Sequence, residues 1–196
     1  MMQGNQLFPV FIKLNELHTV VIGGGPVGLE KLTAILANST QAKVTVIARE
    51  IIEELKVFVA DFPLVELKQK AFEPHDLNGA NLVVAATNDN VLNAEIREAA
   101  KLRGLLVNVA DKPELCDFYL GSIVQKGDLK IAISTNGKSP TIAKRLKEVL
   151  KESLPEELDT TLQQMNSLRN SLQGDFSDKV KKLNEVTEIL TRDLKQ

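Results

Sequence analysis

The chain has 196 residues, of which 43% are hydrophobic and 26% are charged. This length suits one α/β domain with a smaller appendage, and the composition is that of a soluble globular protein rather than a disordered or membrane protein. The formal net charge of −2 argues against a nucleic-acid partner, and the single cysteine, Cys116, excludes an internal disulfide. The first residues lack the basic and long apolar regions of a signal peptide, so we expect a cytoplasmic protein without a membrane partner.

Apolar strands alternate with amphipathic helices over the first 110 residues. The segment 7–14, interrupted by Pro9, is predicted to be a peripheral extended strand. Five further strands are predicted at 18–22, 43–48, 64–67, 81–86 and 105–110, and three helices at 27–37, 51–59 and 91–103. Because parallel neighbours need a crossover between them, this alternation predicts an α/β fold with a Rossmann-type, doubly wound parallel sheet.

The pattern changes after residue 111. Two short strands at 121–125 and 129–134 are separated by a turn, which predicts a β-hairpin. Ser139 is a good N-cap, with Pro140 as the first residue of a helix that extends to about 153. Pro155 then precedes a polar helical tail, predicted at 156–172 and 177–195 around the link 173–175. We therefore divide the chain into a Rossmann domain over 1–112, a middle region over 113–153 and a helical C-terminal domain over 154–196.

A glycine-rich turn follows the strand at 18–22 directly and opens a helix, which is the context that a dinucleotide-binding G-x-G-x-x-G pattern requires. Gly23 would permit the tight turn, Gly25 would let the backbone approach a pyrophosphate, and Gly28 would let the helix pack against the strand. The helix N-terminus would attract the phosphate charge. The candidate cofactor-binding residues here are Gly23, Gly24, Gly25, Pro26, Val27 and Gly28. The alternative is a glycine turn that holds no ligand.

The second strand of such a fold commonly ends in an acidic residue that binds the adenosine ribose. Here it ends with Arg49 followed by Glu50. Glu50 could still reach the ribose of NAD, whereas Arg49 would suit the 2′-phosphate of NADP. The residues alone leave this choice open, and both could also be a solvated strand end.

Two further segments follow strands whose carboxyl ends should share one edge of the sheet, where doubly wound folds bind ligands. Thr87 and Asn88 follow the strand at 81–86 and are candidate cofactor contacts. Asp111 follows the strand at 105–110, so its carboxylate is a candidate acid or base near the nicotinamide. The alternative for Asp111 is a turn or capping residue before Lys112 and Pro113.

A polar loop precedes the helix that begins near Ser139. Loop amides, hydroxyl groups and a helix N-terminus make an anion site, and the helix carries the cations Lys144, Arg145, Lys147 and Lys151. The candidate residues for a carboxylate-rich substrate are Ser134, Thr135, Asn136, Gly137 and Lys138. Ordinary helix capping beside a solvated basic face is the competing interpretation.

Several of these segments together resemble the precorrin-2 dehydrogenase and sirohydrochlorin ferrochelatase family, the N-terminal module of sirohaem synthases. The resemblance covers about 7–150, and it rests on Leu7-Phe8-Pro9-Val10-Phe11, the glycine turn at 23–28, Ala85-Ala86-Thr87-Asn88-Asp89, Asn108-Val109-Ala110-Asp111 and Ser134-Thr135-Asn136-Gly137-Lys138-Ser139-Pro140. It implies NAD-dependent oxidation of precorrin-2, a carboxylate-rich tetrapyrrole, to sirohydrochlorin. It also implies a homodimer formed through the C-terminal parts, so that the middle region would serve dimerisation and substrate binding.

The resemblance assigns roles to individual residues as well. Asp111 matches the family's aspartate for proton removal and, in bifunctional members, for metal insertion. The glycine turn and Arg49 with Glu50 match the family's nucleotide contacts. The family's loop serine falls within Ser134 and Thr135, and the threonine at the second position leaves that serine's role open.

Two alternative functions remain at this point. The chain could be a bifunctional enzyme that also inserts ferrous iron, with Asp111 as its metal-binding residue. It could instead be a non-catalytic domain that senses NAD, because fold alone does not fix function. His18 and His75 are too few and too far apart in the sequence for a histidine metal site, and we assign them no role.

Overall fold

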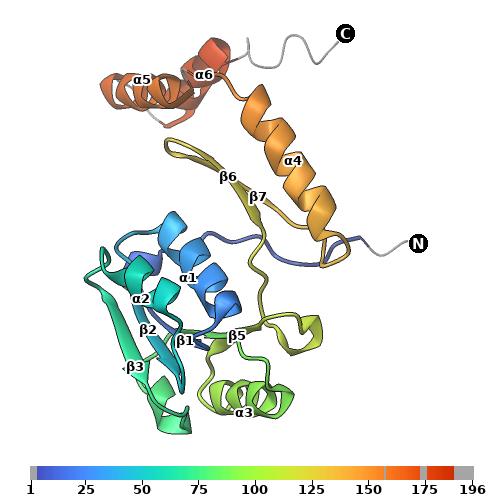
Figure 1. The fold of residues 1–196 in the computed structure, drawn as a ribbon. Helices are drawn as coiled ribbons and strands as arrows, with labels where there is room; N and C mark the ends of the chain where they lie inside the picture. Colours follow the sequence, from blue (N-terminus) through green and yellow to red (C-terminus); the bar gives the residue numbers. More distant parts are fainter. Residues whose placement is uncertain (1–3, 157, 173–175, 188–196) are drawn as a thin grey trace. The chain divides into compact units, whose positions relative to one another are not determined.

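A computed structural model describes residues 4–156, 158–172 and 176–187 of the chain. It divides into two compact units, shown in Figure 1. We call residues 8–120 the larger unit, and residues 1–7 together with 121–196 the smaller unit. Our predicted division into regions 1–112, 113–153 and 154–196 gives each region a role as well as boundaries. It stays a prediction.

The larger unit contains a five-stranded parallel sheet in the order β3-β2-β1-β4-β5. Its strands are β1 (His18–Ile22), β2 (Lys43–Ala48), β3 (Val65–Gln69), β4 (Leu82–Ala85) and β5 (Leu106–Val109). All residues of β4, and four of the five in β1, are buried, as expected for strands covered on both faces. The predicted doubly wound sheet is confirmed.

Helices cover both faces of this sheet. On one face lie α1 (Pro26–Asn38) and α2 (Glu53–Val59), and on the other lies α3 (Asn90–Lys101) (Figure 1). Each face has its own apolar cluster, one including Leu32, Leu36 and Leu55 and the other including Ile96 and Val107. Full burial of such a side chain contributes about 1.5–3 kcal/mol, so these clusters hold the helices to the sheet. Three short 3₁₀ turns, Leu14–Glu16, Pro74–Leu77 and Pro113–Leu115, complete the unit.

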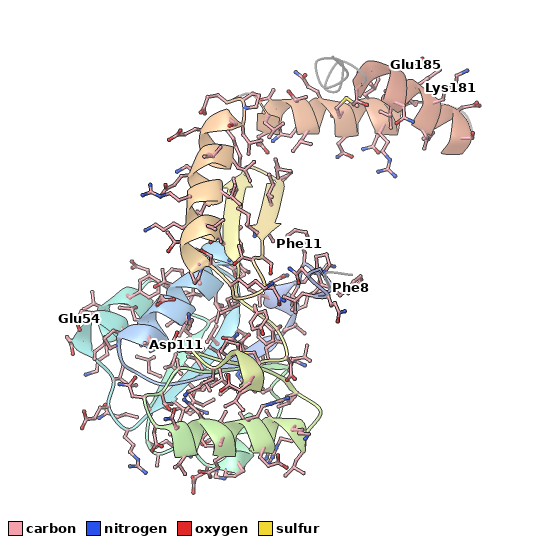
Figure 2. All side chains as sticks on the ribbon, turned by 90° about the vertical axis from the view of Figure 1, so that its right-hand side faces the viewer. Phe8, Phe11, Glu54, Asp111, Lys181 and Glu185 are labelled. Carbon is pink, nitrogen blue, oxygen red and sulfur yellow. The ribbon has the colours of Figure 1, made fainter. Side chains whose placement is uncertain are left out.

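The predicted strand at 7–14 is wrong. Residues 4–13 form no regular element, and a 3₁₀ turn begins at Leu14. Pro9 has no N–H to donate to a ladder, and β1, which follows, already pairs on both sides with β2 and β4. The apolar side chains of the segment therefore have no strand partner, and Phe8 is 86% and Phe11 68% exposed (Figure 2).

The smaller unit begins with the antiparallel hairpin of β6 (Ser122–Lys126) and β7 (Leu129–Ile133), as predicted. Its helices are α4 (Pro140–Ser153), α5 (Leu158–Ser171) and α6 (Phe176–Thr187). Ser139 caps α4 as expected, because its hydroxyl oxygen accepts from the Ile142 N–H at 3.2 Å. The predicted link 173–175 and the predicted end of the last helix, 188–195, lie outside the described residues.

The hairpin turn is tied to the start of α5. Asp159 accepts from the Asp128 N–H at 2.9 Å, and a Cβ at Gly127 would overlap the Asp159 carboxylate. Lys126 donates to the Leu154 carbonyl at 2.8 Å and pairs with Glu156 at 3.1 Å. None of the helices in the part of the chain that the structure describes is long and apolar enough to cross a membrane.

Candidate functional site

The carboxyl ends of the central strands are in line. Ile22 of β1 pairs with Ile47 of β2 on one side and with Ala85 of β4 on the other, and Ala85 pairs with Val109 of β5. The segments that follow these strands therefore share one edge of the sheet. The strand order reverses between β1 and β4, which makes this the topological switch point where open α/β sheets bind ligands.

Of the three glycines of the G-x-G-x-x-G pattern, the first and the third, Gly23 and Gly28, are required by the fold itself. Gly23 has φ +131°, a conformation that L side chains rarely adopt, and a Cβ there would overlap the Ala86 carbonyl. A Cβ at Gly28 would overlap the Gly23 carbonyl oxygen, so α1 packs against the turn only with glycine. These contacts match the roles expected for the first and third glycines of the pattern.

Gly25 differs from both, because a Cβ at this position would meet nothing within 4 Å. Its φ of −91° and ψ of −168° are open to any residue, so the fold does not require glycine here. Gly25 precedes the first residue of α1, and the Leu29 N–H donates to its carbonyl at 3.0 Å. The space beside the N-terminus of a 13-residue helix fits the pyrophosphate of a dinucleotide.

Arg49 and Glu50 lie beside the glycine turn. A Cβ at Gly24 would overlap the Glu50 carbonyl oxygen, and the Ile52 N–H donates to the Gly24 carbonyl at 2.9 Å. The side chains of Arg49 and Glu50 are both exposed at the end of β2. The structure thus brings the two candidates to the turn, and the choice between them stays a prediction.

The loop after β4 is held by its own side chains. The Thr87 hydroxyl donates to Asn93 Oδ1 at 2.7 Å, and Asn93 Nδ2 donates back to the Thr87 carbonyl at 3.1 Å. Asp89 caps α3 by accepting from the N–H groups of Val91 and Leu92. Our sequence analysis missed both Asn93 and this cap, although an aspartate before a helix is a recognised start signal. Asn88 lies between the two anchored residues with its side chain exposed.

Asp111 follows β5 at the same edge and is labelled in Figure 2. It is exposed, and its φ of +58° places it in the left-handed region, which aspartate tolerates better than most residues. Its side chain caps neither end of the 3₁₀ turn at Pro113–Leu115, whose N-cap is Lys112. An exposed carboxylate on a turn beside the switch point is accessible to a substrate.

Cys116 closes the loop that carries Asp111. Its sulfur lies 3.2 Å from the Val109 carbonyl and 3.3 Å from the Lys112 carbonyl, within hydrogen-bond reach of both. Burial raises the pKa of this thiol, which disfavours the thiolate, the nucleophilic form. Asp117 adds a bidentate pair with Arg97, both contacts 2.8 Å long, and accepts from the Val107 N–H at 3.0 Å. The edge of β5 is therefore covered.

The candidate substrate loop, 134–138, belongs to the smaller unit. Asn136 and Gly137 have positive φ values, 54° and 73°. Thr135 accepts from the Ser139 N–H at 3.2 Å and donates to the Ser139 carbonyl at 3.1 Å, while Ser134 accepts from the Asn136 N–H at 3.2 Å. The Thr135 hydroxyl thus fixes the loop onto the start of α4. The role of these residues in substrate binding stays a prediction.

His18 has a structural environment, with its Nε2 2.9 Å from the Thr45 hydroxyl and its Nδ1 3.3 Å from the Gly79 carbonyl. His75 lies on an exposed 3₁₀ turn beside Glu73 and Asp76. Within 4–156, 158–172 and 176–187, no three His, Cys, Asp or Glu side chains are gathered closely enough to hold a metal ion.

Comparison with known protein families gives two matches. Residues 10–122 match a family described as putative NAD(P)-binding, and residues 126–153 match the central part of sirohaem biosynthesis proteins. The first match covers more than half of the chain. The chain belongs to this NAD(P)-binding family. The predicted nicotinamide dinucleotide cofactor is thereby confirmed.

Curated relatives of this chain support the predicted resemblance to sirohaem synthases. The siroheme synthase of Methylococcus capsulatus is 38% identical over 161 residues, which are 82% of this chain and 33% of the relative. That of Pseudoalteromonas atlantica is 32% identical over 189 residues, 96% of this chain and 40% of the relative. The chain thus spans a third or somewhat more of the length of these curated relatives.

A solved structure is similar over nearly the whole chain. It is SirC, a precorrin-2 dehydrogenase, with a TM-score of 0.74, 27% sequence identity and coverage of 92% of this chain and 89% of that one. The resemblance to the sirohaem biosynthesis enzymes and the predicted fold class, including the small hairpin and the C-terminal helices, are confirmed.

Proposed function

We propose that this chain catalyses the NAD-dependent dehydrogenation of precorrin-2 to sirohydrochlorin in sirohaem biosynthesis. The observation that carries the proposal is the similarity to a solved precorrin-2 dehydrogenase, which covers 92% of the chain. A similarity restricted to the Rossmann sheet would support only a nucleotide-binding fold, because that sheet serves many functions.

The residues at the sheet edge fit a dinucleotide. Gly25 leaves open space beside the N-terminus of α1, where backbone and helix charge would hold the pyrophosphate. Exposed Glu50 and Arg49 are available to the adenosine ribose, and exposed Asn88 to the part of the cofactor nearer the switch point. Bound NAD supplies the hydride acceptor for the oxidation.

Asp111 is our candidate for the base. Oxidation of a saturated carbon pair removes one hydride and one proton, and an exposed carboxylate at the carboxyl end of β5 can accept that proton. The loop held by Cys116 fixes the backbone on which Asp111 stands. Asp111 thus lies on a fixed support while its side chain is free to meet a substrate.

The loop at 134–138 is our candidate for substrate carboxylates. Its fixed turn, the N-terminus of α4 and the exposed lysines on that helix offer N–H groups and positive charge. Lys138 adds a positive charge within the loop itself, so Lys138→Ala should raise the KM for precorrin-2 and leave the affinity for NAD unchanged.

We also propose a homodimer formed through the smaller unit. Ile142, Leu146 and Val149 recur at helical spacing on α4, and each is at least 45% exposed. An exposed apolar stripe of this kind is typical of an interaction surface. A second copy of the chain would bury it.

We expect NAD to be preferred over NADP. A carboxylate at Glu50 favours an unmodified ribose, because it would repel the 2′-phosphate, whereas Arg49 acts in the opposite direction. A comparison of kcat/KM for the two cofactors tests this expectation. A clear preference for NADP would transfer the dominant role to Arg49.

The proposed function is tested by mixing the protein with precorrin-2 and NAD under anaerobic conditions and following the absorbance spectrum. We expect conversion to the sirohydrochlorin spectrum, at a rate that depends on protein and NAD concentrations. A domain that only senses NAD would bind the nucleotide and leave precorrin-2 unchanged, and that result would refute the proposal.

A further inference from the structure

The loop between β4 and α3 is anchored by an amide that lies inside the protein. Asn93 is only 2% exposed and is one of four buried polar side chains among the described residues, with Thr19, Thr45 and Asn108. Burying an amide is costly unless it is hydrogen-bonded. Both ends of the Asn93 amide bond to one residue, Thr87, through its hydroxyl at 2.7 Å and its carbonyl at 3.1 Å.

These two hydrogen bonds engage the hydroxyl and the carbonyl of Thr87 within the protein. The Thr87 hydroxyl gives its hydrogen to Asn93, also accepts from the Asp89 N–H at 3.2 Å, and its carbonyl is occupied by Asn93 Nδ2. Thr87 therefore has no free hydroxyl hydrogen for a ligand. Asn88, between Thr87 and the capping residue Asp89, keeps an exposed side chain.

The first residue of the anchored loop, Ala86, contacts the glycine turn. Ala86, the residue before Thr87, donates from its N–H to the Ile22 carbonyl at 2.7 Å, and its own carbonyl occupies the place of a Cβ at Gly23. A displacement of Thr87 would therefore act directly on the neighbourhood of the glycine turn. The position of Asn88 relative to the turn depends on how Thr87 is held.

We propose that Asn93 is a positioning residue for the dinucleotide: by holding Thr87, it fixes Asn88 and the end of β4 beside the glycine turn. In this arrangement Thr87 serves as a tie and Asn88 is the residue that faces the cofactor. The inference rests on the proposed function only through the cofactor, and it concerns binding before any chemistry on a tetrapyrrole.

The test measures the dissociation constant for NAD by calorimetry, without tetrapyrrole, well below the melting temperature of each variant. Asn93→Ala removes both bonds and frees the loop, so we expect affinity to fall by roughly tenfold. Thr87→Ser keeps the hydroxyl and the carbonyl and should bind NAD within about twofold of wild type. Thr87→Val removes only the hydroxyl with little change of shape and should weaken binding by a smaller factor than Asn93→Ala.

Two controls separate positioning from stability. Ile96→Val removes one buried methylene group from the same helix, so it should lower the melting temperature and leave NAD affinity unchanged. Because Asn93→Ala already removes both hydrogen bonds to Thr87, the double variant Thr87→Val with Asn93→Ala should bind NAD about as well as Asn93→Ala alone.

The outcomes are distinct. Wild-type affinity in folded Asn93→Ala, or additive losses in the double variant, would overturn the positioning role. If Asn93→Ala does not fold, Thr87→Val decides, and unchanged affinity there overturns the proposal. A wild-type chain that binds no NAD would refute the proposed function and this inference together, whereas a failure to oxidise precorrin-2 with NAD binding intact would refute only the proposed function.

Discussion

The two units differ in how completely each buries its apolar residues. The larger unit has two buried clusters, one on each face of its sheet. In the described part of the smaller unit only Val124 and Ala143 are buried hydrophobic residues, while Ile142 and Val149 of α4 are more than half exposed. The larger unit can thus fold around its own core, whereas the described part of the smaller unit buries few of its apolar side chains within itself.

The loops that carry the proposed site residues are also fixed differently in the two units. The turn after β1, the loop after β4 and the loop after β5 are fixed by contacts within the larger unit, through Ala86, Asn93 and Cys116. The loop at 134–138 is fixed by contacts within the smaller unit, through Thr135 with Ser139 and through Ser134, which accepts from Asn5 Nδ2 at 3.3 Å. We therefore expect cofactor affinity to be a property of the larger unit.

The largest effect should come from Gly25→Val. The fold has room for a side chain at this position, so the variant should stay folded while valine fills the space proposed for the pyrophosphate. We expect loss of measurable NAD binding by calorimetry with a melting temperature near that of wild type. Gly28→Val is the contrasting variant, because its Cβ would overlap the Gly23 carbonyl and the fold itself should be destabilised. Normal NAD binding by Gly25→Val would remove the glycine turn from the site.

Asp111→Asn should have the next largest effect. The change removes the proposed base but keeps a side chain that tolerates the left-handed backbone, so turnover should fall by about 10²- to 10⁴-fold with NAD affinity unchanged. If the wild-type protein also inserts ferrous iron into sirohydrochlorin, that activity should fall as well. The control is Asp111→Gly, which suits the backbone and lacks a carboxylate; we expect equal inactivity with equal or higher stability. Near-normal turnover in both variants would make Asp111 a turn residue only.

Leu146→Glu should dissociate the proposed dimer. A charge on the exposed stripe of α4 could not be buried at an interface without a large cost, so sedimentation should show a monomer at micromolar concentrations. The matched control is Val57→Glu on α2, where the replaced valine is also exposed but lies on the larger unit. A monomeric wild type, or a dimer that survives Leu146→Glu, would contradict the contrast between the units.

The smallest effect concerns the core of the larger unit. The Thr19 hydroxyl is buried without a hydrogen-bond partner among the described residues, so Thr19→Val should raise the free energy of unfolding by about 1 kcal/mol. The control is Thr45→Val. The Thr45 hydroxyl lies 2.9 Å from His18 Nε2, so its removal should lower the free energy of unfolding. Denaturant titrations measure both. Equal losses in the two variants would show that the Thr19 hydroxyl contributes a favourable interaction.

The sheet and the glycine turn could be predicted because local patterns determine them. Buried strands such as Leu82–Ala85 are continuous apolar runs in the sequence, and a glycine pattern between a strand and a helix has few other uses. The same reasoning failed at 7–14, where an apolar run predicts a strand but the chain offers it no partner strand. Whether a run pairs depends on the topology of the whole sheet.

The parts of the site that escaped prediction depend on particular side-chain contacts, which the periodicity of strands and helices does not encode. In the sequence Asn93 looks like an ordinary polar helix residue, and only the structure shows that it bonds to Thr87. The role of Asp117 likewise depends on its ion pair with Arg97, twenty positions earlier. Asp111 could be placed at the correct edge from the strand pattern, but its left-handed backbone could not be foreseen.

We propose that the chain holds NAD at the glycine turn and uses it to oxidise precorrin-2. The most direct measurement is a single-turnover reaction under anaerobic conditions, in which NADH and sirohydrochlorin are quantified together for the wild-type chain and for Gly25→Val. We expect one NADH for each sirohydrochlorin with the wild type and neither product with the variant. Sirohydrochlorin formed without NADH, or equal yields from the two proteins, would contradict this proposal.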